Sequence, residues 1–271
     1  MNRNRRREIA EQTVHIIDQG YYERSDGTPV DLSDSLEKMK RGTEDSPPER
    51  DIEIPKGSKG APAIEVEVTR ETTLEACRRL LVETERILAL NFASATSPGG
   101  GFLSGASAQE ESLARSSGLY ASLLKSDMYD YHRERDLPMY SDYAIYSPNV
   151  PIFRHDDGEL LDEPFHATFL TCAAVNIHRV EQQPLRPEEE IEEVMDRRIQ
   201  RVLGIAYEKS HTHLVLGAWG CGVFGNDPEV IAELFAEALD GPFRGLFDHV
   251  VFAVYDSEGG PNISAFRQCF E

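Results

Sequence analysis

The chain has 271 residues, of which 40% are hydrophobic and 28% are charged, and its formal net charge is −20. This length and composition are typical of a globular protein with one large domain or two small ones. The negative charge argues against binding to duplex nucleic acid, which requires clustered Lys and Arg. If an anion binds, we expect local backbone groups to hold it.

The sequence gives no sign of a membrane protein or of a disulfide framework. No run approaches the roughly 18 apolar residues of a membrane span, and the basic start at 3–7 leads into an amphipathic helix rather than a signal peptide. Four cysteines lack any Cys-x-x-Cys spacing and are predicted to be free thiols: Cys77, Cys172, Cys221 and Cys269. We therefore expect a cytoplasmic protein with no membrane partner.

The first 62 residues differ from the rest of the chain. Helical spacing over 5–19 and 31–41 is separated and followed by polar stretches that contain Gly and Pro. We predict that 1–62 is a helical extension that packs on a main domain at 63–271. Two acidic stretches, 44–53 and 181–196, are expected to form a solvated loop and a helix face.

From Ala63 onward, predicted strands alternate with amphipathic helices. The strands are expected at 63–68, 86–94, 143–153, 167–177, 213–219 and 249–256. The helices are expected at 72–83, about 108–131, about 188–210 and 229–239. Short apolar strands between amphipathic helices predict an α/β domain with a mixed, largely parallel sheet and helices on both faces.

Two glycine-rich loops follow predicted strands. Residues 97–107 come after the strand around Leu90, and residues 220–226 come after the strand around Leu216. Ligands of such sheets bind outside the carboxyl ends of the strands. Glycine lets the backbone approach a ligand and turn N–H groups toward it, and a following helix start favours phosphate. These loops predict a phosphate-bearing ligand.

The second loop matches the dinucleotide-binding pattern G-x-G-x-x-G at 220–225. A Rossmann unit also needs an acidic residue about 20 positions further on, at a strand end, and a second half of the fold. Asp240 falls in a turn, Asp256 is too distant, and too little chain follows. An NAD(P)-dependent oxidoreductase is thus a weaker alternative.

Two other motifs suggest chemistry less strongly. His211 and His213 have the spacing of two metal ligands on one strand, but they lie at its amino end, so we predict packing and no metal site. Cys221 lies in a glycine-rich loop, yet no histidine is placed near it in the sequence to activate it as a nucleophile. We interpret Cys221 as a small residue tolerated beside a ligand.

Two adjacent carboxylates follow the first loop. Ser107 and Glu110 have the spacing of a capping box, in which Glu110 would reach back to the helix start. Glu111 lies about 100° further round the helix and is not needed by this cap. Glu111 is therefore the better catalytic candidate, and capping remains an alternative role for Glu110.

Together these motifs are similar to those of one family. Three glycines, seven residues and Gln109-Glu110-Glu111, with "NFASATSP" before and "GAWGCGVFGNDP" far downstream, resemble the bacterial-type poly(ADP-ribose) glycohydrolases. The resemblance implies a macrodomain-like fold and hydrolysis of the ribose–ribose O-glycosidic bond of poly(ADP-ribose), which releases ADP-ribose without metal or cofactor. It also implies poly(ADP-ribose), ADP-ribose and ADP-ribosylated proteins as partners. A macrodomain that only binds ADP-ribose is the alternative.

The resemblance also implies roles for individual residues. Glu111 would be the general acid and base, and Glu110 would contact the adjacent ribose. Ligand contacts are expected from Asn91, Gly99, Gly100, Gly101 and Gln109 in the first region, and from Gly220, Cys221, Gly222, Val223, Phe224, Gly225 and Asn226 in the second. Phe224 would stack against the terminal ribose. For at least one of Gly100 and Gly101, we expect the ligand rather than backbone strain to require glycine.

A helix start favours an ionised carboxylate, whereas a general acid must carry a proton. Burial and the nearby diphosphate are therefore expected to outweigh the helix start and keep Glu111 protonated, because both favour the neutral form of a carboxyl group.

Overall fold

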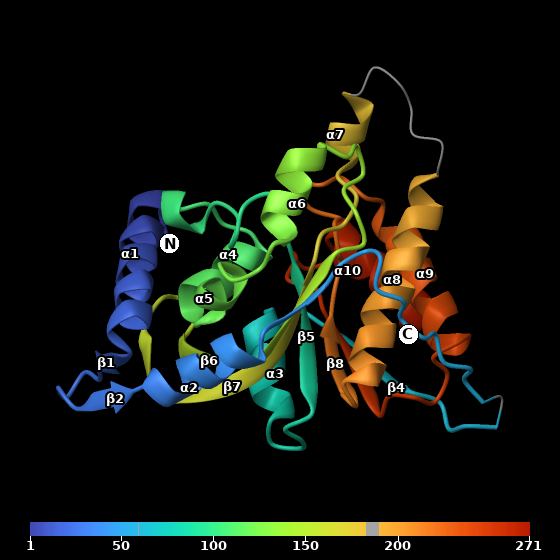
Figure 1. The fold of residues 1–271 in the computed structure, drawn as a ribbon. Coiled ribbons are helices and arrows are strands. Elements are labelled where there is room, and N and C mark those ends of the chain that lie inside the picture. The colour runs from blue at the N-terminus through green and yellow to red at the C-terminus, as the bar shows by residue number, and fades with distance from the viewer. Residues whose placement is uncertain (59, 183–189) are drawn as a thin grey trace.

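The computed structural model describes residues 1–58, 60–182 and 190–271, and its centre is a seven-stranded sheet (Figure 1). The strands lie in the order β3 (Glu44–Ser46), β6 (Ala144–Arg154), β7 (Leu160–Cys172), β5 (Ile87–Phe92), β8 (His213–Leu216), β9 (His249–Ala253) and β4 (Glu65–Thr69). Pairing is antiparallel from β3 to β7 and parallel from β7 to β4. The predicted mixed, largely parallel sheet is confirmed.

Helices cover both faces of this sheet, as predicted. One face carries α8 (Ile191–Glu208), α9 (Pro228–Asp240) and α10 (Pro261–Phe270). The other carries α1 (Arg3–Gln19), α2 (Ser33–Gly42), α3 (Thr73–Leu80), α4 (Gln109–Ser116), α5 (Leu119–Leu123) and α6 (Met128–Arg135). Leu88 and Leu90 of β5 belong to the first core and Ile87 and Ala89 to the second. Both faces of this central strand are apolar, which is why its sequence shows no alternation.

The ends of several helices follow from local sequence. Thr72 and Glu75 form a capping box at the start of α3, and Pro228 and Pro261 begin α9 and α10. Proline suits a first helical turn, where its missing N–H has no intrahelical partner. These signals fix where the chain leaves one strand and begins the next helix.

The long helix expected over 108–131 is wrong. The structure instead has α4, α5 and α6. The first break is at Ser117, whose backbone is extended (φ −147°, ψ 176°) and forms a bridge with Ile152 of β6. The Ser117 hydroxyl also donates to Leu113 O at 2.7 Å, which occupies a carbonyl at the end of α4. Tertiary pairing with β6 overrides the helical spacing here.

Several small elements were not predicted. These are α10, the hairpin of β1 (Tyr21–Glu23) and β2 (Pro29–Asp31), α7 (Ile177–Glu181), the 3-10 turn η1 (Phe102–Ser104) and β3. Strand β3 lies where the sequence suggested a solvated loop. The acidic stretch 181–196 is described only in part, because 183–189 lie outside the described residues. α8 begins at Ile191 rather than near 188.

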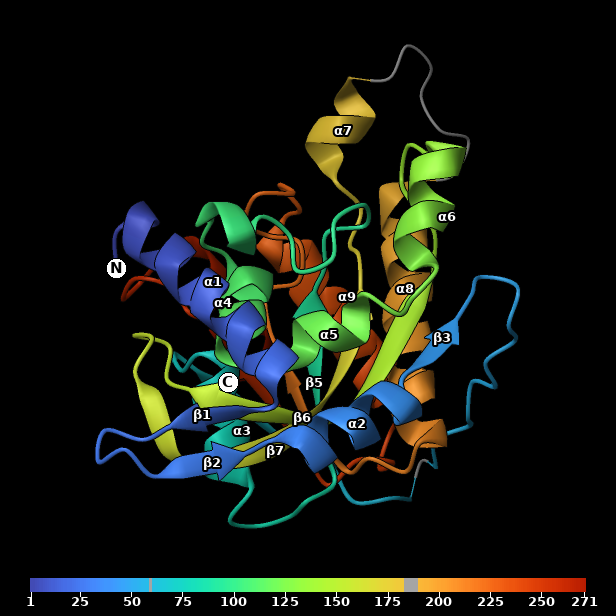
Figure 2. The same cartoon turned by 60° about the vertical axis from the view of Figure 1, so that its left-hand side comes forward.

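The N-terminal segment contacts the first glycine-rich loop. Figure 2 shows α1 beside α4, and Arg3 Nε and Arg6 Nε donate to Ser104 O and Gly105 O at 3.0 and 2.8 Å. Because β3 from this segment pairs with β6 in the main sheet, residues 1–62 contribute to the sheet as well as covering it. The division at residue 62 stays a prediction.

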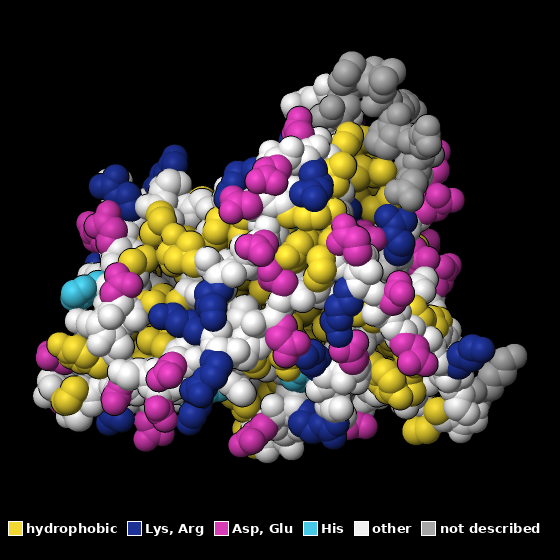
Figure 3. All heavy atoms as spheres, in the orientation of Figure 1, with side chains coloured by type: hydrophobic (Ala, Val, Ile, Leu, Met, Phe, Trp, Pro, Cys, Tyr) yellow, Lys and Arg dark blue, Asp and Glu magenta, His cyan; other side chains and the backbone are white. Residues whose placement is uncertain are grey.

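The structure shows how charged side chains are distributed on one face and whether any helix could span a membrane. On the face shown in Figure 3, Lys and Arg side chains alternate with Asp and Glu and form no continuous basic area. Of the helices in the described part of the chain, none is long and apolar enough to cross a membrane.

Candidate active site

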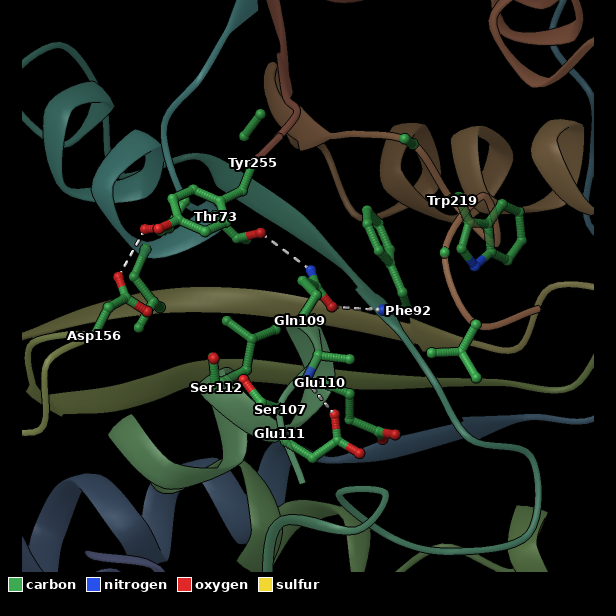
Figure 4. A pocket seen from close by; sticks show the side chains of 18 of the residues that line it. Thr73, Phe92, Ser107, Gln109, Glu110, Glu111, Ser112, Asp156, Trp219 and Tyr255 are labelled. Carbon is green, nitrogen blue, oxygen red and sulfur yellow. Dashed lines mark hydrogen bonds between the residues drawn. The ribbon is translucent and has the colours of Figure 1, made fainter. Parts of the chain in front are cut away.

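A cleft of about 760 Å³ opens at the carboxyl ends of the parallel strands (Figure 4). It lies among the residues that follow β5, β8 and β9, the first turn of α4 and the start of α3. This volume is in the range of small-molecule sites. Both predicted glycine-rich loops reach the region, so the sheet brings together segments more than 100 residues apart in sequence.

Gln109 fixes the start of α4 against β5. Its Oε1 accepts from the Phe92 N–H at 2.9 Å, and its Nε2 donates to Leu90 O at 2.8 Å and to Thr73 Oγ1 at 3.1 Å (Figure 4). These bonds engage both ends of the amide. Gln109 lines the cleft, but the substrate contact predicted for it would have to compete with bonds that position the helix.

Glu110 is the buried carboxyl of the pair, with 3% of its surface exposed. Its Oε2 accepts from the Ser94 N–H at 2.7 Å, and its Oε1 lies 3.4 Å from Asn91 Nδ2, which also donates to Thr171 Oγ1. Burial raises the pKa of Glu110 to about 8, against the opposing effect of the Ser94 N–H and with a further increase from the Glu111 charge. At neutral pH this carboxyl is therefore mainly protonated.

Glu111 is only half-buried and lines the cleft, so the deep burial expected for it is found at Glu110 instead. Its Oε1 accepts from the Gly101 N–H and its Oε2 from the Ala108 N–H, each at 2.9 Å. The predicted capping pair of Ser107 and Glu110 is wrong, because α4 begins one residue later than expected, so that Ala108 takes the N-cap position. Glu111, not Glu110, reaches back to the helix start.

Gly100 lies directly against both carboxyl groups. A β-carbon on Gly100 would lie 2.4 Å from Glu111 Oε1 and 3.1 Å from Glu110 Oε2, and the residue has φ +59°. Gly99 also has positive φ, whereas a β-carbon on Gly101 would meet the Ala106 side chain at 2.9 Å. The protein itself thus requires these glycines, whether or not a ligand also does, which corrects our interpretation of Gly100 and Gly101.

The second loop is closed by Asn226. Its Nδ2 donates to Val175 O at 2.8 Å and to Gly220 O at 3.1 Å, and the side chain is buried. A β-carbon on Gly220, at φ +79°, would lie 2.5 Å from this amide. The structure therefore shows Asn226 holding the loop in shape.

The other side chains of the second loop differ from one another in solvent exposure. Val223 is 78% exposed, Phe224 is half-buried, and both line the cleft together with Gly222. Cys221 is half-buried and its side chain packs against the core of α8 and α9. Burial raises the pKa of Cys221 to about 12, so its thiol is not ionised at neutral pH, which agrees with our interpretation that it is not a nucleophile.

Comparison with known proteins identifies the family. A sequence profile of the microbial-type PARG catalytic domain matches residues 10–155. The structure of poly(ADP-ribose) glycohydrolase (PARG) from Thermomonospora curvata is 48% identical, covers 99% of this chain and 100% of its own, and superposes with a TM-score of 0.91. The chain belongs to the microbial-type PARG family. A comparison with curated proteins gave no match.

Other PARG structures extend this similarity. The T. curvata enzyme bound to the inhibitor ADP-HPD is 48% identical, with a TM-score of 0.88, and covers 98% of this chain and 99% of its own. PARG from Deinococcus radiodurans in complex with ADP-ribose is 44% identical, with a TM-score of 0.77, and covers 87% of this chain and 97% of its own. The expected family and macrodomain-like fold are confirmed.

In this PARG-family chain, the residues predicted for the site fall into two groups. Those that line the cleft are Gln109, Glu110, Glu111, Gly220, Gly222, Val223 and Phe224. Those that do not line it are Asn91, Gly99, Gly100, Gly101, Cys221, Gly225 and Asn226. Ligand contacts remain a prediction for both groups.

Some cleft residues were not predicted from sequence. Phe92 is the last residue of β5, Tyr255 follows β9, and Asp156 comes from the turn between β6 and β7 (Figure 4). Asp156 accepts from Thr72 Oγ1 at 2.7 Å, and burial raises its pKa. Ligands bind outside the carboxyl ends of parallel strands, and this rule, which located the glycine loops, also points to Phe92 and Tyr255. No sequence pattern marks Asp156, because a turn between two antiparallel strands has no such rule.

Proposed function

We propose that the chain is a poly(ADP-ribose) glycohydrolase that cleaves the ribose–ribose O-glycosidic bond and releases ADP-ribose. The observation that carries this proposal is the pair of carboxyl groups of Glu110 and Glu111, of which the first is buried and the second half-buried. Both lie at the start of α4 and line a cleft that two glycine-rich loops also reach. Membership of the PARG family and similarity to PARG structures with ADP-ribose and ADP-HPD support it.

Glu111 is the catalytic acid and base in this proposal. Cleavage of the glycosidic bond places positive charge on the ribose, and protonation of the leaving oxygen by Glu111 eases departure. Glu111 then takes a proton from the water that attacks the anomeric carbon, so the bond is exchanged for two hydroxyl groups and the acid is restored. Its bonds to the N–H groups of Gly101 and Ala108 fix the orientation of the carboxyl.

Glu110 binds the ribose beside the scissile bond. A protonated carboxyl can donate and accept hydrogen bonds, whereas an ionised one can only accept. Glu110 and Glu111 are sequence neighbours at one helix start, not carboxylates on opposite sides of a sugar. The usual division into nucleophile and acid therefore does not apply to this pair.

The two loops and two aromatic residues hold the rest of the substrate. Backbone N–H groups of 220–225 bind the diphosphate, and Phe224 stacks against the terminal ribose. Tyr255 is 80% exposed at the cleft, so its ring is free to stack on adenine. We propose that the polymer is carried by ADP-ribosylated proteins in the cytoplasm, which agrees with four free thiols in the described chain.

Incubation with automodified polymer, followed by chromatography of the products, tests the proposal. Release of ADP-ribose is expected. Polymer that is bound but not shortened would instead indicate a macrodomain that only recognises ADP-ribose ends. Hydride transfer with NAD(P), together with no ADP-ribose release, would restore the oxidoreductase alternative.

A further inference from the structure

Three potential metal ligands meet at the opposite edge of the sheet from the cleft. Among the described residues, Glu83, His213 and His249 place one ligand atom each within 4.8 Å of the others. His213 and His249 are the first residues of β8 and β9 and lie directly opposite each other in register. Glu83 comes from the turn after α3. The three groups are therefore presented by three separate elements, at the amino ends of the parallel strands.

The Nε2 atoms of His213 and His249 lie near carboxylates but have no hydrogen bond within the described part of the protein. His213 Nδ1 is hydrogen-bonded to Thr212 Oγ1 at 3.0 Å, which leaves Nε2 directed at Glu83 Oε2, 3.8 Å away. His249 is 5% exposed, and its buried Nε2 has no hydrogen-bond partner, although Glu67 Oε2 lies 3.7 Å away. Buried polar atoms are normally hydrogen-bonded, so an imidazole nitrogen without a hydrogen bond, beside a second imidazole and two carboxylates, points to a ligand.

The charges around the cluster favour a cation. Two carboxylates lie beside the imidazoles: Glu83 Oε2 is 3.8 Å from His213 Nε2, and Glu67 Oε2 is 3.7 Å from His249 Nε2. The Arg79 guanidinium is paired with Glu67 and Glu71, so its charge is already offset.

We propose that Glu83, His213 and His249 bind one zinc-type divalent cation, with water completing the coordination. Two imidazoles and one carboxylate are a known ligand set for Zn²⁺, and the Thr212 hydroxyl on His213 Nδ1 is the kind of outer hydrogen bond that orients such a ligand. Zinc ligands at about 2.0–2.2 Å lie roughly 3.3–3.6 Å from one another in a tetrahedron, so the cluster must contract slightly. Glu83 is exposed on a turn and can make that movement.

This proposal changes our interpretation of His213, whereas His211 packs inside the protein as predicted. His211 and His213 were treated together as a pair on one strand, but His211 Nε2 is hydrogen-bonded to Tyr146 OH at 2.9 Å. The partner of His213 comes from the neighbouring strand instead. A bound cation would join β8, β9 and the turn after α3, so its effect is on stability rather than on catalysis.

Zinc titration of the chelator-treated, full-length protein tests the site. Calorimetry should show about one equivalent of Zn²⁺ bound, and thermal unfolding should shift upward with Zn²⁺ but not with Mg²⁺, which prefers oxygen ligands. His213→Gln, His249→Gln and Glu83→Gln should each weaken binding by at least about tenfold. His15→Gln, at an exposed histidine on α1, should bind as the wild type does.

A variant at an exposed ligand and a Co²⁺ spectrum test the site independently of any folding defect. If a histidine variant is poorly folded, Glu83→Gln decides, because that side chain is exposed and its loss should not disturb the core. Co²⁺ should give a spectrum without a thiolate-to-metal charge-transfer band, since no cysteine takes part. No Zn²⁺ uptake by the wild type, undiminished uptake by Glu83→Gln, or a thiolate band would overturn the assignment.

Discussion

Gly100 and Glu111 are in such close contact that a β-carbon on residue 100 would lie 2.4 Å from Glu111 Oε1. Residue 100 also has φ +59°, a conformation that side chains disfavour. The missing side chain therefore makes room for the proposed catalytic carboxyl and permits the backbone turn. The glycine run and the carboxylates form one structural unit.

Gly100→Ala should therefore lower both stability and activity. A residue held in a disfavoured backbone region costs about 1–3 kcal/mol, and the new methyl group would displace the Glu111 carboxyl. Chemical denaturation and polymer hydrolysis measure the two effects. Gly222→Ala is the control for stability, because no atom lies within 4 Å of a β-carbon there and its φ is not positive. A Gly100→Ala protein with wild-type unfolding midpoint and turnover would contradict this account.

The raised pKa of Glu110 predicts a pH-dependent contribution to stability. The folded protein holds this proton up to about pH 8, while the unfolded chain releases it near 4.5. The contribution is fully present below pH 4.5 and falls by about 1.4 kcal/mol per pH unit as the pH rises toward 8. Glu110→Gln should remove this dependence, so the difference in unfolding free energy between variant and wild type should shift in favour of the variant over this interval. A pH-independent difference would show that Glu110 is ionised in the folded state.

Tyr255 is predicted to bind the adenine of the ligand. Tyr255→Ala should weaken ADP-ribose binding by about 1–3 kcal/mol, the usual value for loss of a base-stacking ring, without a change in unfolding midpoint. Binding of ribose 5-phosphate, which lacks adenine, should not change. Tyr207→Ala, at an exposed tyrosine on α8 that does not line the cleft, is the matched control. Equal ADP-ribose affinity of Tyr255→Ala and wild type would remove this residue from the adenine site.

The sequence was most informative where local pattern and tertiary structure agree. Strand β5 and helix α3 were predicted within a few residues, because an apolar run and helical spacing report directly on which side chains are buried. The helix after the carboxylates was misjudged because pairing between Ser117 and Ile152 is a tertiary event that helical spacing does not encode.

For the candidate site, too, the sequence located residues but did not predict their surroundings. Glu110 and Glu111 were located from sequence, but their environments were not, because the position of α4 relative to Ser94 and Gly101 depends on the folded loop. A shift of one residue in the helix start exchanged the capping role between them. Residue spacing therefore located the pair, and only the fold distinguished the buried acid from the one at the cleft.

Glu111 is proposed to supply the proton for bond cleavage, and the decisive measurement is the turnover of poly(ADP-ribose) by Glu111→Gln. Glu110→Gln should also lower activity. For Glu111→Gln we expect kcat to fall by about 10² to 10⁴, the usual contribution of a general acid, while calorimetry still shows ADP-ribose binding. Turnover by Glu111→Gln within about threefold of the wild type would show that Glu111 is not the general acid.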